Sequence, residues 1–266
     1  MLKYLFLHMH KTGGTSVVEN FWKPSIPLDE RYLEEDHLPG GPREQEAYLY
    51  NYMYCTARDF RLNYRDVFAA FWNTHLPRDR RLYSGHFGYG IHDVIGGPCR
   101  YATVVRDPIA RTISHFHVVK SLKAFDGDFG DYIQSGGIET SNYQTMLLTR
   151  DGFSRRHCLT VADLDEALHN LTTEFDFCVT EDIDDFVDEL IVKYRRPIVN
   201  ARIWANRTDD SITVKGSPLF VHERFPVDES AMGLLIEKNQ LDLVLYQSAR
   251  DESRRRRRKT NQGGNE

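Results

Sequence analysis

The sequence is poor in cysteine and lacks both a long apolar run and a leader-like start. It contains four cysteines with no Cys-x-x-Cys pair among them, at Cys55, Cys99, Cys158 and Cys178. This wide spacing indicates neither a zinc site nor a disulfide framework. No apolar run approaches the roughly 20 residues that a membrane-spanning helix requires, and the first residues do not form a cleavable signal peptide. We therefore expect a cytoplasmic protein without a membrane span.

The composition is that of an ordinary globular protein with an unevenly charged C-terminus. Hydrophobic residues make up 41% of the 266 positions, which is enough for one substantial α/β domain. The formal net charge is −5, yet residues 254–259 are all basic. We expect one domain over residues 1–250 and a basic, disordered tail over residues 251–266. Such a tail can bind an anionic polymer or a membrane surface, but we do not expect nucleic acid as a partner.

A predicted strand-to-helix connection near the N-terminus has the pattern of a phosphate-binding loop. An apolar strand is predicted over residues 3–8, and a helix is predicted to begin at Thr15. Between them, Gly13 and Gly14 allow backbone N–H groups to approach a ligand. The N-terminal end of a helix favours an anion, and Lys11 adds a positive charge. The segment therefore predicts an anion site.

A second predicted strand-to-helix connection lies further along the chain. Asp107 is a good N-cap residue and Pro108 a good first helical residue, so the strand predicted over residues 99–105 ends just before Arg106. Ser114 lies in the helix that follows. Arg106 and Ser114 can therefore both face the crevice in which open α/β sheets bind their ligands.

Together the two segments resemble the sulfotransferases that depend on 3′-phosphoadenosine 5′-phosphosulfate (PAPS). The likeness is greatest to the branch that contains the heparan and uronyl 2-O-sulfotransferases and their bacterial homologues. The family's first motif, His-x-x-Lys-Thr-Gly-Gly-Thr-Ser, is similar to residues 8–16, and its second, Arg-Asp-Pro-x-x-Arg-x-x-Ser, is similar to residues 106–114. Weaker similarity extends to residue 250. The position before Lys11 is usually proline in this branch and is His10 here.

The resemblance implies roles for individual residues. It implies that the 5′-phosphosulfate is held by the first motif, Lys11, Thr12, Gly13, Gly14, Thr15 and Ser16, and the 3′-phosphate by Arg106 and Ser114. Lys11 would also stabilise the charge that develops on the leaving phosphate, which is an electrostatic task that needs no metal. We therefore expect PAPS as the sulfuryl donor and no metal ion.

Sulfuryl transfer also needs a base for the acceptor. A histidine with an ordinary pKa of about 6.5 accepts a proton at neutral pH. We expect His86 to be this base, because it resembles the family's catalytic histidine and follows a predicted strand. His10 and His92 are the alternatives. His8 lies on a predicted strand and is expected to be a buried hydrogen-bonding residue.

Strands alternate with helices along much of the chain. Further strands are predicted at about residues 81–84 and 174–180, and helices at about residues 108–123, 183–194 and 230–249. This alternation favours a parallel sheet with helices on both faces. The expected fold is α/β, a P-loop-like three-layer sandwich.

The resemblance implies a sulfotransferase that moves a sulfuryl group from PAPS to an acceptor hydroxyl. We expect the acceptor to be a carbohydrate or a glycosylated small molecule. Two other functions stay open at this point: a nucleotide-dependent kinase or NTPase, and a non-catalytic protein that binds an anionic polymer. The kinase alternative is weakened by residue order, because Lys11 precedes the two glycines whereas a Walker lysine follows them. The oligomeric state is not indicated by the sequence.

Overall fold

The computed structural model describes residues 2–17, 20–21, 82–85, 87–194 and 223–263. His86, the predicted base, lies outside these residues. Every structural statement below concerns the described segments.

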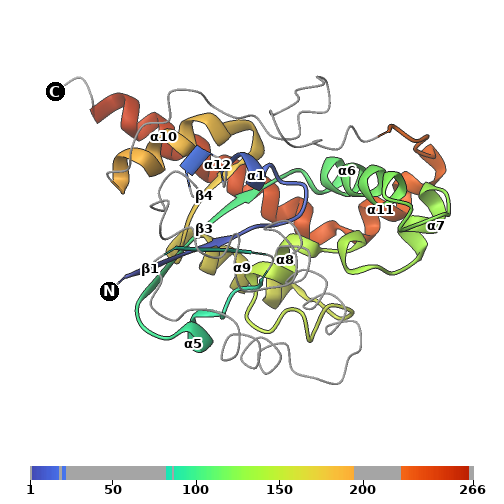
Figure 1. Cartoon of the computed structure of the whole chain (residues 1–266), viewed down its shortest axis with the longest axis horizontal. Helices are drawn as coiled ribbons and strands as arrows, with labels where there is room; N and C mark the ends of the chain where they lie inside the picture. The colour runs from blue at the N-terminus through green and yellow to red at the C-terminus, as the bar shows by residue number, and fades with distance from the viewer. Residues whose placement is uncertain (1, 18–19, 22–81, 86, 195–222, 264–266) are drawn as a thin grey trace, which may run out of the picture.

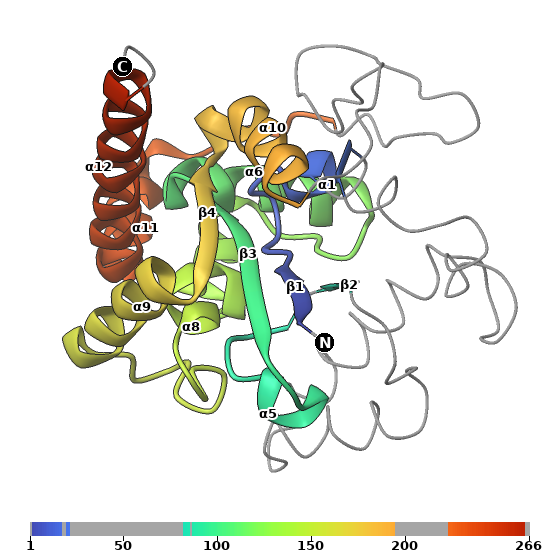
Figure 2. The ribbon, with the colours of Figure 1, turned by 90° about the vertical axis from the view of Figure 1, so that its left-hand side faces the viewer.

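The described strands form a sheet of four parallel strands. Their bounds are β1 Lys3–Leu7, β2 Leu82–Gly85, β3 Cys99–Val105 and β4 Phe175–Val179. The order across the sheet is β2-β1-β3-β4, and each neighbouring pair is parallel (Figure 1; β2 is labelled in Figure 2). Because all four strands run the same way, their carboxyl ends lie at one edge of the sheet, as predicted for this class of fold.

Helices connect and cover the strands (Figure 2). The α-helices of the described segments are α1 Gly14–Val17, α5 His92–Ile95, α6 Pro108–Ser121, α7 Phe129–Gln134, α8 Tyr143–Leu148, α9 Val161–Thr173, α10 Ile183–Lys193, α11 Met232–Lys238 and α12 Gln240–Gly263. Short 3-10 turns lie at Ile138–Thr140, Thr180–Asp182 and Glu229–Ala231. Among these helices, none combines the length and the apolar character needed to cross a membrane.

Two hydrophobic clusters cover opposite faces of the sheet. On β1, Leu5 and Leu7 belong to the cluster that includes side chains of α8, α9 and α12. Phe6, between them in the sequence, belongs to the other cluster, which includes side chains of α1 and α10. Successive residues of a strand point to opposite faces, so this alternation shows that the sheet is buried on both sides. The predicted parallel sheet with helices on both faces is therefore confirmed at this level.

The start of α6 follows the predicted capping pattern. The Asp107 carboxylate accepts a hydrogen bond from the backbone N–H of Ala110 at 2.8 Å, and Pro108 is the first helical residue. The carboxylate satisfies one of the free N–H groups of the first turn, while proline fixes a helical φ there. The cap therefore sets the point where the chain turns from β3 into α6, directly after Arg106.

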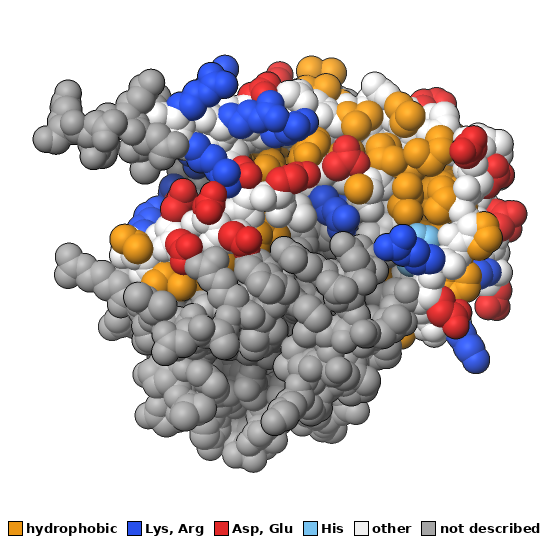
Figure 3. Space-filling view, turned by 90° about the horizontal axis from the view of Figure 1, so that it is seen from above, with side chains coloured by type: hydrophobic (Ala, Val, Ile, Leu, Met, Phe, Trp, Pro, Cys, Tyr) orange, Lys and Arg blue, Asp and Glu red, His pale blue; other side chains and the backbone are white. Residues whose placement is uncertain are grey.

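The prediction of a disordered tail over residues 251–266 was wrong for residues 251–263, because α12 continues to Gly263. The guanidinium of Arg257 lies 2.7 Å from a carboxylate oxygen of Asp182 and 2.9 Å from one of Asp185. Arg256 lies over the ring of Phe177 at 4.5 Å and pairs with Glu252 one turn earlier. Figure 3 shows basic and acidic side chains intermixed near this end of the chain. These partners offset part of the repulsion within the run of like charge.

Candidate functional site

The candidate site lies where the direction of the sheet's connections reverses. After β1 the chain forms β2 on one side of β1, and then forms β3 on the other side. Open α/β sheets bind their ligands outside the carboxyl ends of the strands at such a point. The loop of residues 8–13 follows β1, and Arg106 follows β3, so both predicted motifs lie at this place (Figure 1).

The two glycines of the first motif are required by the protein's own packing. Gly13 has a φ of +88°, and a Cβ atom there would lie 2.4 Å from Cδ1 of Ile183 in α10. A Cβ atom on Gly14 would lie 2.4 Å from Cδ2 of His8. No side chain fits at these distances, so the loop can pack onto α10 and onto His8 only without one.

The residues of the first motif differ in accessibility. Thr12 is fully buried; its Oγ1 donates to the carbonyl of Met9 at 3.1 Å, and its own carbonyl accepts from Oγ1 of Thr180 at 2.9 Å. Gly14 and Ser16 are also buried, whereas Lys11, Gly13 and Thr15 are partly exposed. Thr12 therefore holds the loop in place, and the three partly exposed residues are the ones that a ligand can reach.

Arg106 and Lys11 adjoin although they are 95 residues apart in the sequence. Nη1 of Arg106 donates to the backbone carbonyl of Lys11 at 2.8 Å. This contact also ties the loop to the end of β3. The two sequence motifs, which are predicted to hold opposite ends of one nucleotide, are thus joined directly through the backbone of the first.

The two cations are partly withdrawn from water. Burial, followed by the charge of Arg106, lowers the pKa of Lys11 to about 8. Burial also lowers the pKa of Arg106, an effect that the carboxylate of Glu181 opposes. Among the described residues no carboxylate forms an ion pair with Lys11. A bound anion would restore the stabilisation that the lysine loses on leaving water.

Gln144 of α8 fixes the backbone of Arg106 from both sides. Its Oε1 accepts from the Arg106 N–H at 2.9 Å, and its Nε2 donates to the Arg106 carbonyl at 2.7 Å. Asp242 of α12 in turn accepts from the backbone N–H groups of Gln144 and Thr145, at 2.9 and 2.7 Å. Asp242 was not predicted from the sequence, although an acidic residue among the apolar positions of the final helix was a signal for it.

The remaining residues of the second motif lie apart from this contact. Ser114 is a partly exposed residue of α6, and no hydrogen bond between it and Arg106 is present in the described part of the structure. Arg111 is fully buried; its guanidinium donates to Oγ1 of Thr112 at 2.9 Å and to the carbonyl of Glu139, and it lies over the ring of Tyr143 at 4.6 Å. Arg111 thus holds α6 against residues 139–143.

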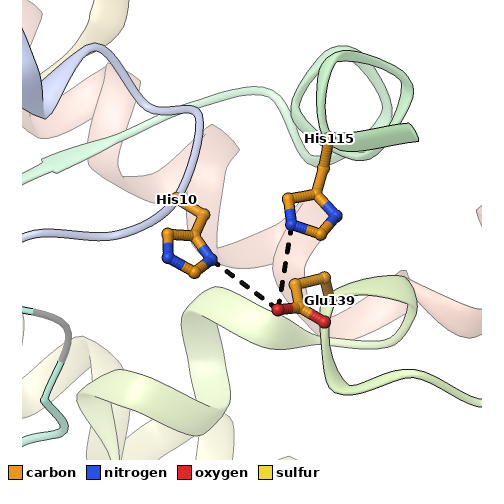
Figure 4. Close-up of side chains that lie close together, drawn as sticks. All are labelled: His10, His115 and Glu139. Atoms are coloured by element: carbon orange, nitrogen blue, oxygen red, sulfur yellow. Dashed lines mark ion pairs between the residues drawn. The ribbon is translucent and has the colours of Figure 1, made fainter. Parts of the chain in front are cut away.

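Two histidines and a glutamate meet beside Lys11 (Figure 4). Nδ1 of His10 lies 3.6 Å from Oε1 of Glu139, and Nε2 of His115 lies 3.8 Å from the same oxygen. The rings of His10 and His115 are stacked, with their centroids 5.6 Å apart. A hydrogen bond of 2.6 Å joins Nδ1 of His115 to the hydroxyl of Tyr132. His10 was predicted as an alternative base, whereas His115 and Glu139 were not predicted.

Burial keeps both imidazoles neutral at physiological pH. It holds the pKa of His10 well below its usual range, and the charges of His8, Arg111 and Lys11 act in the same direction. It also lowers the pKa of His115 to about 3, against the opposing effect of Glu139. Neutral imidazole and carboxylate are ligands for divalent metals, and the three ligand atoms lie within 4.8 Å of one another. The nearby Arg111 and Lys11 charges work against a cation there.

A cavity of about 670 Å³ opens beside this cluster. Its volume is in the range of small-molecule sites. The lining residues come from the first loop, α6, the segment up to Glu139 and the turn after α8: His10, Lys11, His115, Val118, Val119, Leu122, Ala124, Phe125, Tyr132, Ser135, Gly136, Gly137, Ile138, Glu139, Arg156 and His157. The cavity therefore adjoins both Lys11 and the two neutral imidazoles.

Comparison with known proteins gives no family for this chain. No protein-family model matches it, and no curated protein matches it significantly. The function of the chain is therefore inferred from the residues and their arrangement.

Proposed function

We propose that this chain is a sulfotransferase that transfers a sulfuryl group from PAPS to an acceptor hydroxyl. The observation that carries the proposal is the contact between Arg106 and the Lys11 carbonyl at the switch point of the sheet. It joins the two sequence motifs that resemble the sulfotransferase family. As part of the same proposal, the β1 loop and its sheet form a P-loop-like sandwich.

The charges of the site fit an anionic donor. Lys11 and Arg106 are both partly buried, and no described carboxylate pairs with Lys11. In the proposal the partly exposed Lys11, Gly13 and Thr15 bind the 5′-phosphosulfate, with Thr12, Gly14 and Ser16 shaping the loop beneath them, and Arg106 and Ser114 bind the 3′-phosphate. PAPS supplies the sulfuryl group.

The reaction places two demands on the side chains. The S–O bond to the phosphate breaks as an S–O bond to the acceptor forms, and Lys11 stabilises the negative charge left on the phosphate. The acceptor hydroxyl must lose its proton to a base. We propose His86 for this role, with His10 as the alternative because it lines the cavity next to Lys11.

Calorimetric titration with adenosine 3′,5′-bisphosphate, the desulfated nucleotide, tests the proposal. The parent protein should bind it, and Lys11→Ala and Arg106→Ala should each weaken binding about tenfold or more, because each removes a charged hydrogen-bonding group. Arg100→Ala is the matched control. Arg100 is at the opposite end of β3, where it donates to the carbonyl of Thr173 and to Asp176. Failure of the parent to bind the bisphosphate contradicts the proposal.

Turnover with labelled PAPS distinguishes the two bases. Loss of a general base costs about a hundredfold or more in kcat. That loss should follow His86→Ala and leave the affinity for the bisphosphate unchanged. If His10→Ala shows the loss instead, the base assignment moves to His10.

The cluster of His10, His115 and Glu139 favours a second candidate, a metal-dependent nucleotide phosphotransferase or NTPase. In this alternative the three side chains hold a divalent cation that neutralises a triphosphate bound at Lys11. ATP hydrolysis that depends on a divalent cation accepted by imidazole ligands, such as Mn²⁺ or Zn²⁺, and that is lost in Glu139→Gln would support it. Label transfer from PAPS in the presence of EDTA would support the sulfotransferase instead.

For the polymer-binding alternative, two basic residues of the tail are already engaged within the chain. Arg256 and Arg257 have partners within the chain, Glu252, Phe177, Asp182 and Asp185. Side chains so engaged offer less positive charge to an external polyanion.

A further inference from the structure

The cavity beside Lys11 has one polar end and one apolar wall. At the polar end lie His10 and Lys11 of the first loop, with His115 and Glu139 next to them. The wall is formed by Val118, Val119 and Leu122 of the second half of α6, together with Ala124, Phe125 and Ile138. Figure 3 shows hydrophobic side chains gathered on the surface in the region of α6, α7 and α11.

The polar end offers hydrogen-bonding side chains close to a positive charge. Nδ1 of His10 and Nε2 of His115 both face Oε1 of Glu139, at 3.6 and 3.8 Å, and Lys11 adjoins His10 in the chain. A hydroxyl group is both a donor and an acceptor, so it can be satisfied among these side chains. Because Lys11 is the proposed sulfuryl site, this end is where an acceptor oxygen must arrive.

The apolar wall contains side chains that the core does not use. Leu122, at the C-terminal end of α6, is 50% exposed. Val119 and Phe125 pack against the cluster formed by α6, α7 and α11, whereas Val118 and Leu122 belong to none of the described core clusters. Exposed apolar side chains that line a cavity next to a reactive group are typical of a binding surface.

We propose that the cavity binds the acceptor as a single hydroxyl on an apolar body, that is, a phenol or a hydrophobic alcohol. The hydroxyl lies at the His10–Lys11 end, and the body lies against Val118, Leu122 and Phe125. This inference rests on the proposed sulfotransferase function and names its acceptor class. The hydroxyl proton passes to the histidine base, and the hydroxyl oxygen forms the new S–O bond as the S–O bond to the 5′-phosphate of PAPS breaks. The products are a sulfate ester and adenosine 3′,5′-bisphosphate.

The same wall disfavours the carbohydrate acceptor that the sequence resemblance implies. A sugar ring carries several hydroxyl groups, and each one placed against Val118, Val119 or Leu122 would lose its hydrogen bonds to water without gaining a partner. Away from the first loop, the polar side chains of the described lining are Tyr132, Ser135, Arg156 and His157, and the stretch of wall formed by Val118, Val119 and Leu122 contains none of them. A body with one hydroxyl therefore matches the lining better than one with many.

Binding and turnover of 2-naphthol test the proposal against methyl glucoside. Both compounds are titrated into the full chain saturated with adenosine 3′,5′-bisphosphate, and both are assayed with labelled PAPS. The cavity variant is Leu122→Gln, which has a side chain of roughly similar volume and replaces its apolar end by an amide. The control is Val244→Gln, because Val244 of α12 is also 50% exposed and does not line the cavity.

We expect 2-naphthol to bind and to gain label, and methyl glucoside to do neither at the same concentration. Leu122→Gln should raise the Kd and KM for 2-naphthol about fivefold, since about half of a leucine side chain is available to the ligand, while the bisphosphate affinity stays the same. Val244→Gln should behave as the parent does.

Two results would overturn the acceptor class while leaving the proposed function in place. One is bisphosphate binding without 2-naphthol binding up to its solubility limit. The other is 2-naphthol affinity that Leu122→Gln does not change. Failure to bind the bisphosphate is a different result, because it contradicts the sulfotransferase proposal itself.

Discussion

Replacing Lys11 by methionine should make the ligand-free protein more stable and should weaken nucleotide binding. Burial and the neighbouring Arg106 lower the pKa of Lys11 from 10.5 to about 8. At neutral pH, holding the charged form in the folded protein therefore costs about 3 kcal/mol. Methionine has a similar unbranched side chain without the charge, so it adopts the left-handed backbone of this position, φ 64°, at the same steric cost.

The pH dependence of this stabilisation follows from the direction of the shift. The folded pKa lies below the unfolded one, so the unfolded chain binds more protons between pH 8 and pH 10.5. The free-energy cost of holding charged Lys11 in the folded protein is complete below pH 8 and disappears as the pH rises to 10.5. Lys11→Met should therefore raise the free energy of unfolding by about 3 kcal/mol at pH 7 and by about half of that near pH 9.5.

Chemical denaturation at both pH values measures this difference, and calorimetry measures the affinity for adenosine 3′,5′-bisphosphate. We expect the affinity to fall about tenfold or more as stability rises. Lys193→Met is the control, because Nζ of Lys193 donates to Asp176 at 2.6 Å and its loss should lower stability slightly. A Lys11→Met protein that is no more stable than the parent, or whose gain does not depend on pH, would refute the reasoning.

Three further predictions concern the scaffold of the site. Asp242→Ala should lower the free energy of unfolding by about 3 kcal/mol, because two buried N–H groups at the start of α8 lose their acceptor; an unchanged denaturation midpoint would contradict this. Gly13→Ala should destabilise by about 2 kcal/mol or more, and Ile183→Val in the same chain should recover part of the loss by removing Cδ1; additive losses would show that this contact is not the cause. Removal of residues 254–266 should lower the melting temperature by a few degrees and leave bisphosphate affinity unchanged, since the ion pairs of Arg257 are partly exposed; loss of that affinity would tie the tail to the site.

The elements that were predicted most accurately from the sequence are those whose structure depends on nearby residues. The strand at residues 99–105 and the cap at Asp107 were confirmed, because an apolar run followed by Asp-Pro directs the backbone locally. The glycine turn after β1 was also recognised. Its physical reason was recognised only in part, because the atoms that exclude a Cβ at Gly13 belong to Ile183, far along the chain.

The C-terminal helix shows where local reasoning failed. A run of basic residues predicts a solvated, disordered segment when it is considered alone. The helical structure of this segment depends on Asp182, Asp185 and Phe177. These residues lie next to α12 because β4 and the start of α10 pack near it. The sequence contains these residues but gives no indication that they lie next to the arginines.

The charged residues of the candidate site and the turns that need glycine could be recognised from the sequence, because these properties belong to single residues and their neighbours. The folded chain alone shows that Arg106 contacts the Lys11 carbonyl, that Gln144 and Asp242 support it, and that His10 and His115 meet Glu139. Each of these contacts joins segments that the fold brings together across the sheet or between its helices. The pKa values of the site also follow from tertiary structure, because burial is a property of the packed chain.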